Sequence, residues 1–285
     1  MKFGLIPVNV GMQVPEHVIG LAQLAEEAGF ESVWTFEHTI VPVDYNSKYP
    51  YNSSGKMAAE PETNFVDPLI ALTAIAMATK NIRLGTGVNI VSQTNPLMLA
   101  KQAASLDFMS GGRFMLGAGI GWLEEEFKAM GTPFERRGAR FDDYIIAIRK
   151  VWAGEVVEHE SDFVSWHGFK SYPLPVQKPG VPIIMGGHTG KIFERIAAHG
   201  DGWFIPLNDP GEIIAALDKL KTACTVVGRN YDEIELTSFW NPKLGADSLK
   251  FMADLGIERV VTFTASLGSD PAEGARKFAD DYIRA

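Results

Sequence analysis

The sequence contains a single cysteine, Cys224, among 285 residues. One thiol cannot build a disulfide framework or a cysteine-based metal site. Basic clusters are also missing, and the formal net charge of −9 argues against nucleic acid as a partner. No apolar run approaches the ~20 residues that a membrane-spanning helix requires. These absences favour a soluble protein without a membrane or nucleic-acid partner.

Signals for export, for a Rossmann fold and for a metal are missing as well. Residues 1–7 are too short a stretch, and Pro7 interrupts it too soon, for a signal peptide. We therefore expect a cytoplasmic protein. No G-x-G-x-x-G motif follows the first apolar segment, which argues against an open doubly wound sheet. His159, His167 and His199 lack metal-ligand spacing with a carboxylate, so we expect packing or surface roles and no metal site.

Apolar segments and helical periodicity alternate along the chain. Eight short apolar segments have the character of buried strands, at residues 3–7, 32–36, 82–91, 114–118, 181–185, 202–205, 234–240 and 258–263. Helical stretches follow them, at residues 15–28, 69–78, 96–110, 141–152, 191–198, 210–227, 246–255 and 271–283. Eight strand–helix pairs predict an α/β protein with one (β/α)8 TIM barrel, a single domain over residues 1–285.

Two segments interrupt the alternation. Residues 39–64 have neither period and are rich in tyrosine, serine and proline. A loop of this length in a compact domain is usually a lid or a substrate wall, or else disordered. Residues 154–180 suggest a short hairpin followed by an extended proline-rich segment. We interpret both as insertions in barrel loops.

Glycines gather near the carboxyl ends of two neighbouring predicted strands, at Gly85, Gly87, Gly119 and Gly121. Glycine within a strand often marks a place where another group approaches the backbone closely. The carboxyl ends of parallel strands face the active site in such folds. We therefore expect two strands to present bare backbone to one flat ligand. The alternative is that the glycines only turn strand into loop.

Glu37 and His38 stand at the end of the second predicted strand. Adjacent strand residues point to opposite faces, so at most one of them aims into the site. His38 is the stronger candidate because histidine titrates near neutrality and can exchange protons with a substrate. The alternative is a hydrogen-bonded structural histidine.

Other candidates follow later strands. The turn from Gly186 to Gly190 has free backbone N–H groups that could hold a phosphate, although it could equally be a plain turn. Three tryptophans, each a ligand contact or a packing residue, fall near strand ends at Trp122, Trp203 and Trp240. The acidic run 124–126 suits a solvated first helical turn.

Several motifs together resemble the bacterial luciferase-like superfamily, above all its branch that uses the deazaflavin coenzyme F-420. They are Leu84-Gly85-Thr86-Gly87-Val88, Asn95-Pro96, Ala100-Lys101-Gln102, Ser110-Gly111-Gly112-Arg113, Leu116-Gly117-Ala118-Gly119-Ile120-Gly121-Trp122 and Gly200-Asp201-Gly202-Trp203. They occur in order along nearly the whole chain, so their combination is more specific than any one of them.

The resemblance implies a (β/α)8 barrel, usually homodimeric, that binds a flavin-type ring at the carboxyl ends of its strands. It implies a cis peptide between Gly87 and Val88 and a cofactor phosphate at residues 187–189. His38 matches the histidine that abstracts a substrate proton in sugar-phosphate dehydrogenases of the superfamily. Those enzymes place a glutamate acid where this chain has Trp122, which puts sugar-phosphate oxidation in doubt.

The resulting hypothesis is an oxidoreductase that moves hydride between coenzyme F-420 and a small organic substrate. The alternatives are an FMN-dependent monooxygenase and a non-catalytic protein that binds flavin or deazaflavin. The predicted catalytic residues are His38, Glu37 and Trp122. The predicted cofactor contacts are His38, Gly87, Val88, Asn89, Gly119, Gly186, Gly187, His188, Thr189 and Ile205.

Overall fold

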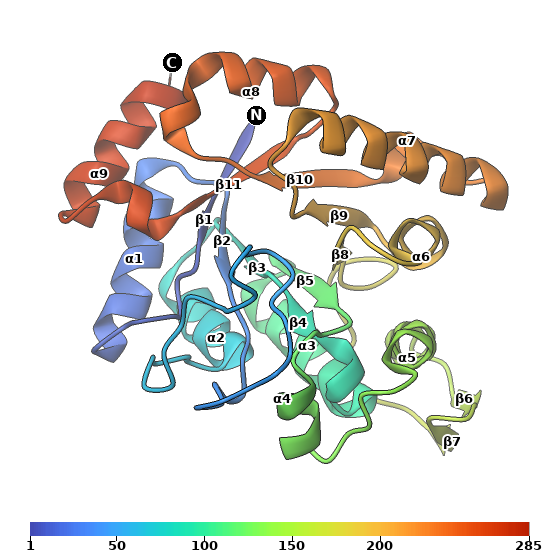
Figure 1. Ribbon diagram of the computed structural model, residues 1–285. Coiled ribbons are helices and arrows are strands. Elements are labelled where there is room, and N and C mark those ends of the chain that lie inside the picture. Colours follow the sequence, from blue (N-terminus) through green and yellow to red (C-terminus); the bar gives the residue numbers. More distant parts are fainter. Residues whose placement is uncertain (285) are drawn as a thin grey trace.

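The computed structural model describes residues 1–284. Its sheet has the strand order β3-β2-β1-β11-β10-β9-β8-β5-β4, and a further pairing of β3 with β5 closes it. All pairings are parallel, which confirms the predicted α/β class and (β/α)8 barrel (Figure 1). The barrel strands are β1 (Lys2–Ile6), β2 (Ser32–Thr35), β3 (Arg83–Thr86), β4 (Asn89–Ile90), β5 (Phe114–Gly119), β8 (Ile183–Gly186), β9 (Gly202–Ile205), β10 (Glu235–Phe239) and β11 (Arg259–Phe263).

Helices surround the barrel and cover its outer face. They are α1 (Pro15–Ala28), α2 (Pro68–Ala78), α3 (Pro96–Ser110), α4 (Glu124–Ala129), α5 (Arg137–Trp152), α6 (Ile192–His199), α7 (Pro210–Val227), α8 (Gly245–Asp254) and α9 (Pro271–Phe278). Proline occupies the first turn of α2, α3 and α7, where its missing N–H costs nothing. Asp67, Asn95 and Asp209 cap these helices by accepting backbone N–H bonds. None of the helices in residues 1–284 is both long and apolar enough to cross a membrane.

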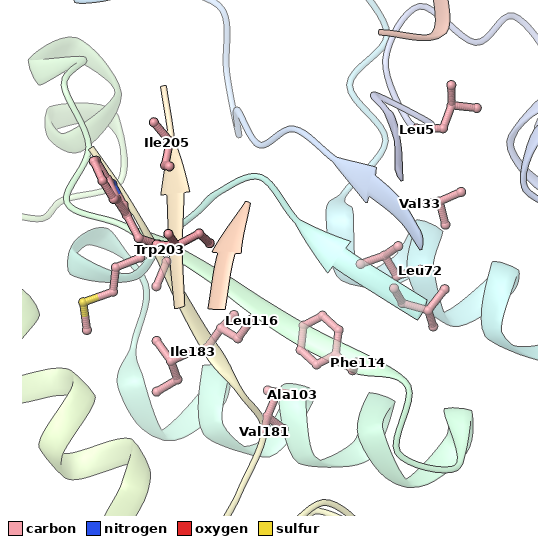
Figure 2. Close-up of a cluster of buried hydrophobic side chains, with 14 of the residues drawn as sticks. Leu5, Val33, Leu72, Ala103, Phe114, Leu116, Val181, Ile183, Trp203 and Ile205 are labelled. Carbon is pink, nitrogen blue, oxygen red and sulfur yellow. The ribbon is translucent and has the colours of Figure 1, made fainter. Parts of the chain in front are cut away.

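The core has two layers, because strand side chains alternate between the barrel interior and the helices. The interior holds Ile6, Trp34, Met115, Ile184, Phe204 and Val261, with Phe36 and Phe239 packed against them. The larger cluster fills the space between strands and helices. Figure 2 shows part of it, including Leu5, Val33, Leu72, Trp203 and Ile205.

The two interruptions of the pattern are confirmed. Residues 39–64 contain neither helix nor strand. The hairpin of β6 (Val157–Glu160) and β7 (Ser165–Phe169) projects beside α5, outside the barrel (Figure 1). Most boundaries shift by one to four residues from prediction, and two elements differ in kind. The strand expected over residues 82–91 is divided into β3 and β4 by a cis peptide between Gly87 and Val88, and the last helix changes to a π-helical turn after Phe278.

Candidate functional site

A chain of aromatic rings crosses the carboxyl end of the barrel. His38 follows β2, Trp122 follows β5 and His188 follows β8, and the 39–64 loop supplies two tyrosines between them. Ring centroids are 6.1 Å apart for His38 and Trp122, 5.1 Å for Trp122 and Tyr49, 5.4 Å for Tyr49 and Tyr51, and 5.8 Å for Tyr51 and His188. The histidine and the glycine turn therefore lie at the same barrel mouth, as the sequence predicts.

The 39–64 loop is fastened to the first turn of α4. Glu125 accepts hydrogen bonds from the backbone N–H groups of Asn46 (2.7 Å) and Ser47 (3.3 Å) and from the Ser47 hydroxyl (2.7 Å). The Ser47 hydroxyl in turn accepts from the backbone N–H of Glu124 (3.0 Å). This attachment holds the neighbouring tyrosines over the mouth.

Glu126 corrects the expectation of a solvated acidic run. Its side chain is only 2% exposed, and its Oε2 lies 3.2 Å from His38 Nδ1. Its Oε1 accepts from the backbone N–H groups of Thr39 (2.5 Å) and Ile40 (3.2 Å). A helical first turn does form here. The prediction failed because the groups that Glu126 binds are distant in sequence.

Glu37 and His38 follow β2, which ends at Thr35, and their side chains have different partners. Its carboxyl group accepts a hydrogen bond from the backbone N–H of Ile90, beside the cis peptide. Burial raises the pKa of Glu37 to about 8, the Ile90 hydrogen bond opposes that shift, and the nearby Glu126 and Asp67 add to it. Glu37 is therefore mostly protonated at neutral pH.

The glycines of β3, β5 and β8 make room for protein atoms. A Cβ on Gly85 would lie 2.3 Å from the Trp34 ring, so Gly85 faces the barrel interior. A Cβ on Gly119 or Gly186 would lie 2.6 Å or 2.9 Å from the Val88 side chain. The expectation of bare backbone facing a ligand is therefore wrong at Gly85 and Gly119. They admit Trp34 and Val88 instead.

The predicted cis peptide is confirmed between Gly87 and Val88. The side chain of Val88 packs between the backbones of β5 and β8, and Asn89 begins β4 directly afterwards. The cis peptide thus lies at the carboxyl end of β3, between β3 and β4.

Buried polar atoms without partners lie on the predicted cofactor residues. Asn89 is 3% exposed, and its Oδ1 has no hydrogen-bond partner within residues 1–284. His188 Nδ1 is also buried and has no hydrogen-bond partner within the same residues. Because unpaired buried polar atoms are costly, both are suited to a polar ligand. Ile205 has no exposed surface and packs on the helix side, so we leave it out of the proposed cofactor site (Figure 2).

The turn after β8 is open at its backbone. Gly187 has φ +127°, a conformation that residues other than glycine rarely adopt, and its carbonyl accepts from Trp203 Nε1 (2.8 Å). Trp203 and Trp240 are buried, and the indole of Trp240 donates to Ser248, so both pack in the core. Of the three candidate tryptophans, only Trp122 belongs to the ring chain at the mouth.

The sequence matches the family described as luciferase-like monooxygenase over residues 2–281. The chain belongs to this family. An uncharacterised protein of Mycobacterium tuberculosis (strain ATCC 25618 / H37Rv) is 31% identical over 252 residues, covering 88% of each chain. The 5,10-methylenetetrahydromethanopterin reductase of Methanolobus tindarius is 28% identical, covering 95% of this chain and 73% of its own.

A solved structure extends the comparison to three dimensions. The coenzyme F-420-dependent tetrahydromethanopterin reductase of Methanopyrus kandleri superposes with a TM-score of 0.80 at 18% identity, covering 99% of this chain and 98% of that one. At this identity the likeness shows the shared barrel. Together the comparisons establish an oxidoreductase or monooxygenase of the luciferase-like class.

Sequence reasoning missed Tyr49, Tyr51 and Glu126. The acidic run directly after a barrel strand was the available signal for Glu126, since residues following strand ends face the mouth. The two tyrosines stand in a loop without periodicity, so no local pattern indicated which side chains turn inward.

Proposed function

We propose that the protein transfers hydride between coenzyme F-420 and a small organic substrate. The observation that carries the proposal is one barrel mouth that combines a histidine, two unpaired buried polar atoms and the Gly87–Val88 cis peptide. Support comes from the similarity to methylenetetrahydromethanopterin reductases and to the coenzyme F-420-dependent reductase fold. When bound, the deazaflavin would supply a ring carbon that accepts or gives hydride.

The residues present fit such a cofactor. Gly87, Val88 and Asn89 would hold the ring, and the unpaired Asn89 Oδ1 would accept a ring N–H. Gly119 and Gly186 would support the ring indirectly, because they seat the Val88 side chain. The phosphate would bind at Gly187, His188 and Thr189, where backbone N–H groups and a histidine nitrogen are available.

The chain's own groups would move the proton and exclude water. His38 would exchange a proton with the substrate through its ring, and Glu37, largely protonated at neutral pH, would serve as a second proton donor. Trp122 and the loop tyrosines would wall the site, since their rings form a continuous series. A site with little water strengthens the remaining polar interactions.

The second candidate is an FMN-dependent monooxygenase, which the family description favours. FMN and the deazaflavin share a tricyclic ring, but the deazaflavin has carbon in place of nitrogen N5 and does not activate oxygen. A third possibility is a protein that binds either cofactor without turnover. The three differ in cofactor affinity, oxygen use and hydride exchange.

The deciding experiment titrates the purified protein with coenzyme F-420 and with FMN, following absorbance and fluorescence. We expect tighter binding of coenzyme F-420 and hydride exchange without oxygen consumption. Tighter binding of FMN with substrate-dependent oxygen uptake would establish the monooxygenase instead. Binding without turnover across a panel of alcohols, aldehydes and imines would favour the carrier.

The role of His38 is tested by His38→Ala. If His38 exchanges the substrate proton, turnover should fall roughly 10²–10⁴-fold while cofactor affinity stays nearly intact. A loss that appears mainly as weaker cofactor binding would indicate that His38 only supports the ring. Normal turnover with a lowered melting temperature would make it a structural residue.

We also propose a homodimer that buries exposed apolar side chains on α2 and α3. Ile70 and Met77 lie seven residues apart on α2, and Met98 and Met109 lie eleven apart on α3, so each pair shares a helix face. All four are exposed, and such apolar groups on packed neighbouring helices mark association surfaces.

Analytical sedimentation tests the proposed dimer. We expect a dimer for the wild type, and a folded monomer for the double variant that combines Met77→Glu with Met109→Glu. A wild-type monomer would refute the proposal.

A further inference from the structure

Glu126 holds His38 and the backbone beside it at the same time. Its Oε1 accepts from the N–H groups of Thr39 and Ile40, the two residues that follow His38, while its Oε2 faces the imidazole Nδ1 at 3.2 Å. The carboxylate itself is anchored in the first turn of α4 and is almost fully buried. One side chain therefore sets both the position of the histidine backbone and the orientation of its ring.

This arrangement decides which nitrogen of His38 carries the proton. A backbone N–H can only donate, so Oε1 is an acceptor, and an ionised carboxylate accepts on Oε2 as well. Nδ1 facing that oxygen then bears the hydrogen, because a neutral imidazole has one donor nitrogen and one acceptor nitrogen. Nε2 is left as the acceptor.

Nε2 is also the nitrogen that remains available. Within residues 1–284 it has no hydrogen-bond partner. It is also not one of the fully buried polar atoms that lack a partner. The His38 side chain keeps 12% exposure, while Glu126 covers the Nδ1 side. The neighbouring rings of Phe65 and Trp122 meet the imidazole at interplanar angles of 90° and 85° and limit its rotation.

We propose that Glu126 is a positioning residue that keeps the His38 proton on Nδ1, so that Nε2 is the nitrogen that exchanges a proton in the site. The proposal rests on the function proposed above for His38. Two further carboxyl groups are nearby: Glu37, after β2, lies close enough to Glu126 to interact with its charge, and Asp67, before α2, lies near Glu37 in turn. Neither has a hydrogen bond to the imidazole, so Glu126 alone sets the tautomer.

Glu126→Gln tests the proposal because the amide keeps the shape of the carboxylate. Its oxygen can still accept from Thr39 and Ile40, but its NH₂ group would then face Nδ1 and donate. The proton of neutral His38 must therefore move to Nε2. Nitrogen-15 NMR of histidine-labelled protein without cofactor reads this directly, and the spectrum of His38→Ala assigns the signal. We expect Nδ1–H in the wild type and Nε2–H in Glu126→Gln.

Glu125→Gln is the matched control. It alters the neighbouring carboxylate, which fastens Asn46 and Ser47 and does not contact His38. The tautomer should stay unchanged in this variant. A wild-type spectrum with the proton on Nε2, or an unchanged tautomer in folded Glu126→Gln, would overturn the proposal. The wild-type measurement decides the matter even if the variant fails to fold.

Kinetics separate this inference from the proposed function. Glu126→Gln should lower kcat by roughly 10²–10⁴-fold, as expected for a base in the wrong tautomer, with cofactor affinity within about threefold of wild type. Combining it with His38→Ala should cost little more than His38→Ala alone, since the two act as a unit. If the tautomer reverses while His38→Ala retains normal turnover, the catalytic role fails and the positioning role stands.

Discussion

At the scale of single residues, Glu37 and His38 show how two neighbours just after a strand acquire different chemistry. One carboxyl group is buried against the Ile90 backbone with a raised pKa, and the other side chain faces a carboxylate on α4. The two side chains reach different partners, the Ile90 backbone and the Glu126 carboxylate. A neutral carboxylic acid and an oriented imidazole can therefore stand side by side at one mouth.

The raised pKa of Glu37 makes stability depend on pH. The carboxyl group binds its proton more tightly in the folded protein, where its pKa is about 8, than in the unfolded chain, where the ordinary value is 4.5. Its contribution to stability is therefore fully present below about pH 4.5 and is lost as pH rises through 8. A tenfold difference in proton affinity is equivalent to about 1.4 kcal/mol, so the loss is on the order of 5 kcal/mol.

Glu37→Gln should abolish this loss, because the amide does not titrate. Melting temperatures of the wild type and the variant, measured from pH 5 to 9, should then diverge, with the variant more stable at high pH. Parallel curves would contradict the prediction.

At the scale of elements, α4 and the 39–64 loop form one functional unit. The three glutamates of the first turn contribute a backbone N–H or a carboxylate to different points of the loop. Tyr49 and Tyr51 stand just beyond the point that Ser47 fastens. The loop therefore needs no secondary structure of its own to hold its aromatic side chains in place.

Ser47→Ala should loosen this attachment. It removes the hydroxyl that links Glu125 and the Glu124 backbone, at a cost of about 1–2 kcal/mol. We expect KM for the substrate to rise roughly five- to thirtyfold while cofactor affinity and the melting temperature change little. Ser54→Ala is the control, because Ser54 bonds only within its own turn at Lys56. Equal effects of the two substitutions would show that the fastening is unimportant.

The turn after β8 carries a prediction of its own. Replacing Gly187 by valine should weaken cofactor binding tenfold or more, since losing charge-assisted hydrogen bonds costs roughly 1.5–3 kcal/mol each. Its φ of +127° adds strain, while a Cβ would meet only Ile192 at 3.7 Å, so the barrel itself has room. Gly190→Ala, at φ +65° in open space, is the control. Unchanged affinity in a folded Gly187→Val variant would remove the phosphate from this turn.

At the scale of the whole molecule, a buried cluster of charged side chains lies at the amino end of the barrel strands, opposite the site. Arg259 is fully buried and donates to both carboxylate oxygens of Glu31, each at 2.7 Å, and to Glu235. These acceptors precede β2 and begin β10, so one guanidinium joins three parts of the sheet. The bidentate geometry is the strong form of such a contact.

Arg259→Met should destabilise the fold by about 3–5 kcal/mol, because two carboxylates lose their buried partner. Urea unfolding followed by circular dichroism measures the change. Arg136→Met is the control, since Arg136 pairs with Asp162 at the exposed surface, where an ion pair contributes about 0–1 kcal/mol. Similar losses in both variants would show that the buried cluster has no special role.

Much of the fold could be predicted because its signals are local. The bounds of α7 agree with prediction residue for residue, since the Asp209 cap, Pro210 and the left-handed Gly228 mark them within a few positions. Parallel strands joined by helices then restrict the topology to very few arrangements. Of the candidate site, His38, Trp122 and His188 do meet at one mouth.

The sequence by itself determined the order of elements, the barrel and the end at which the site lies, because each depends on short-range periodicity and on the direction of strands. Only the tertiary structure decided which side chains contact the glycines and the glutamates at the site. Gly85 admits Trp34, Gly119 and Gly186 admit Val88, and Glu126 meets His38 across 88 positions of sequence. Such contacts depend on which strand ends become neighbours when the barrel closes, and no local pattern carries that information.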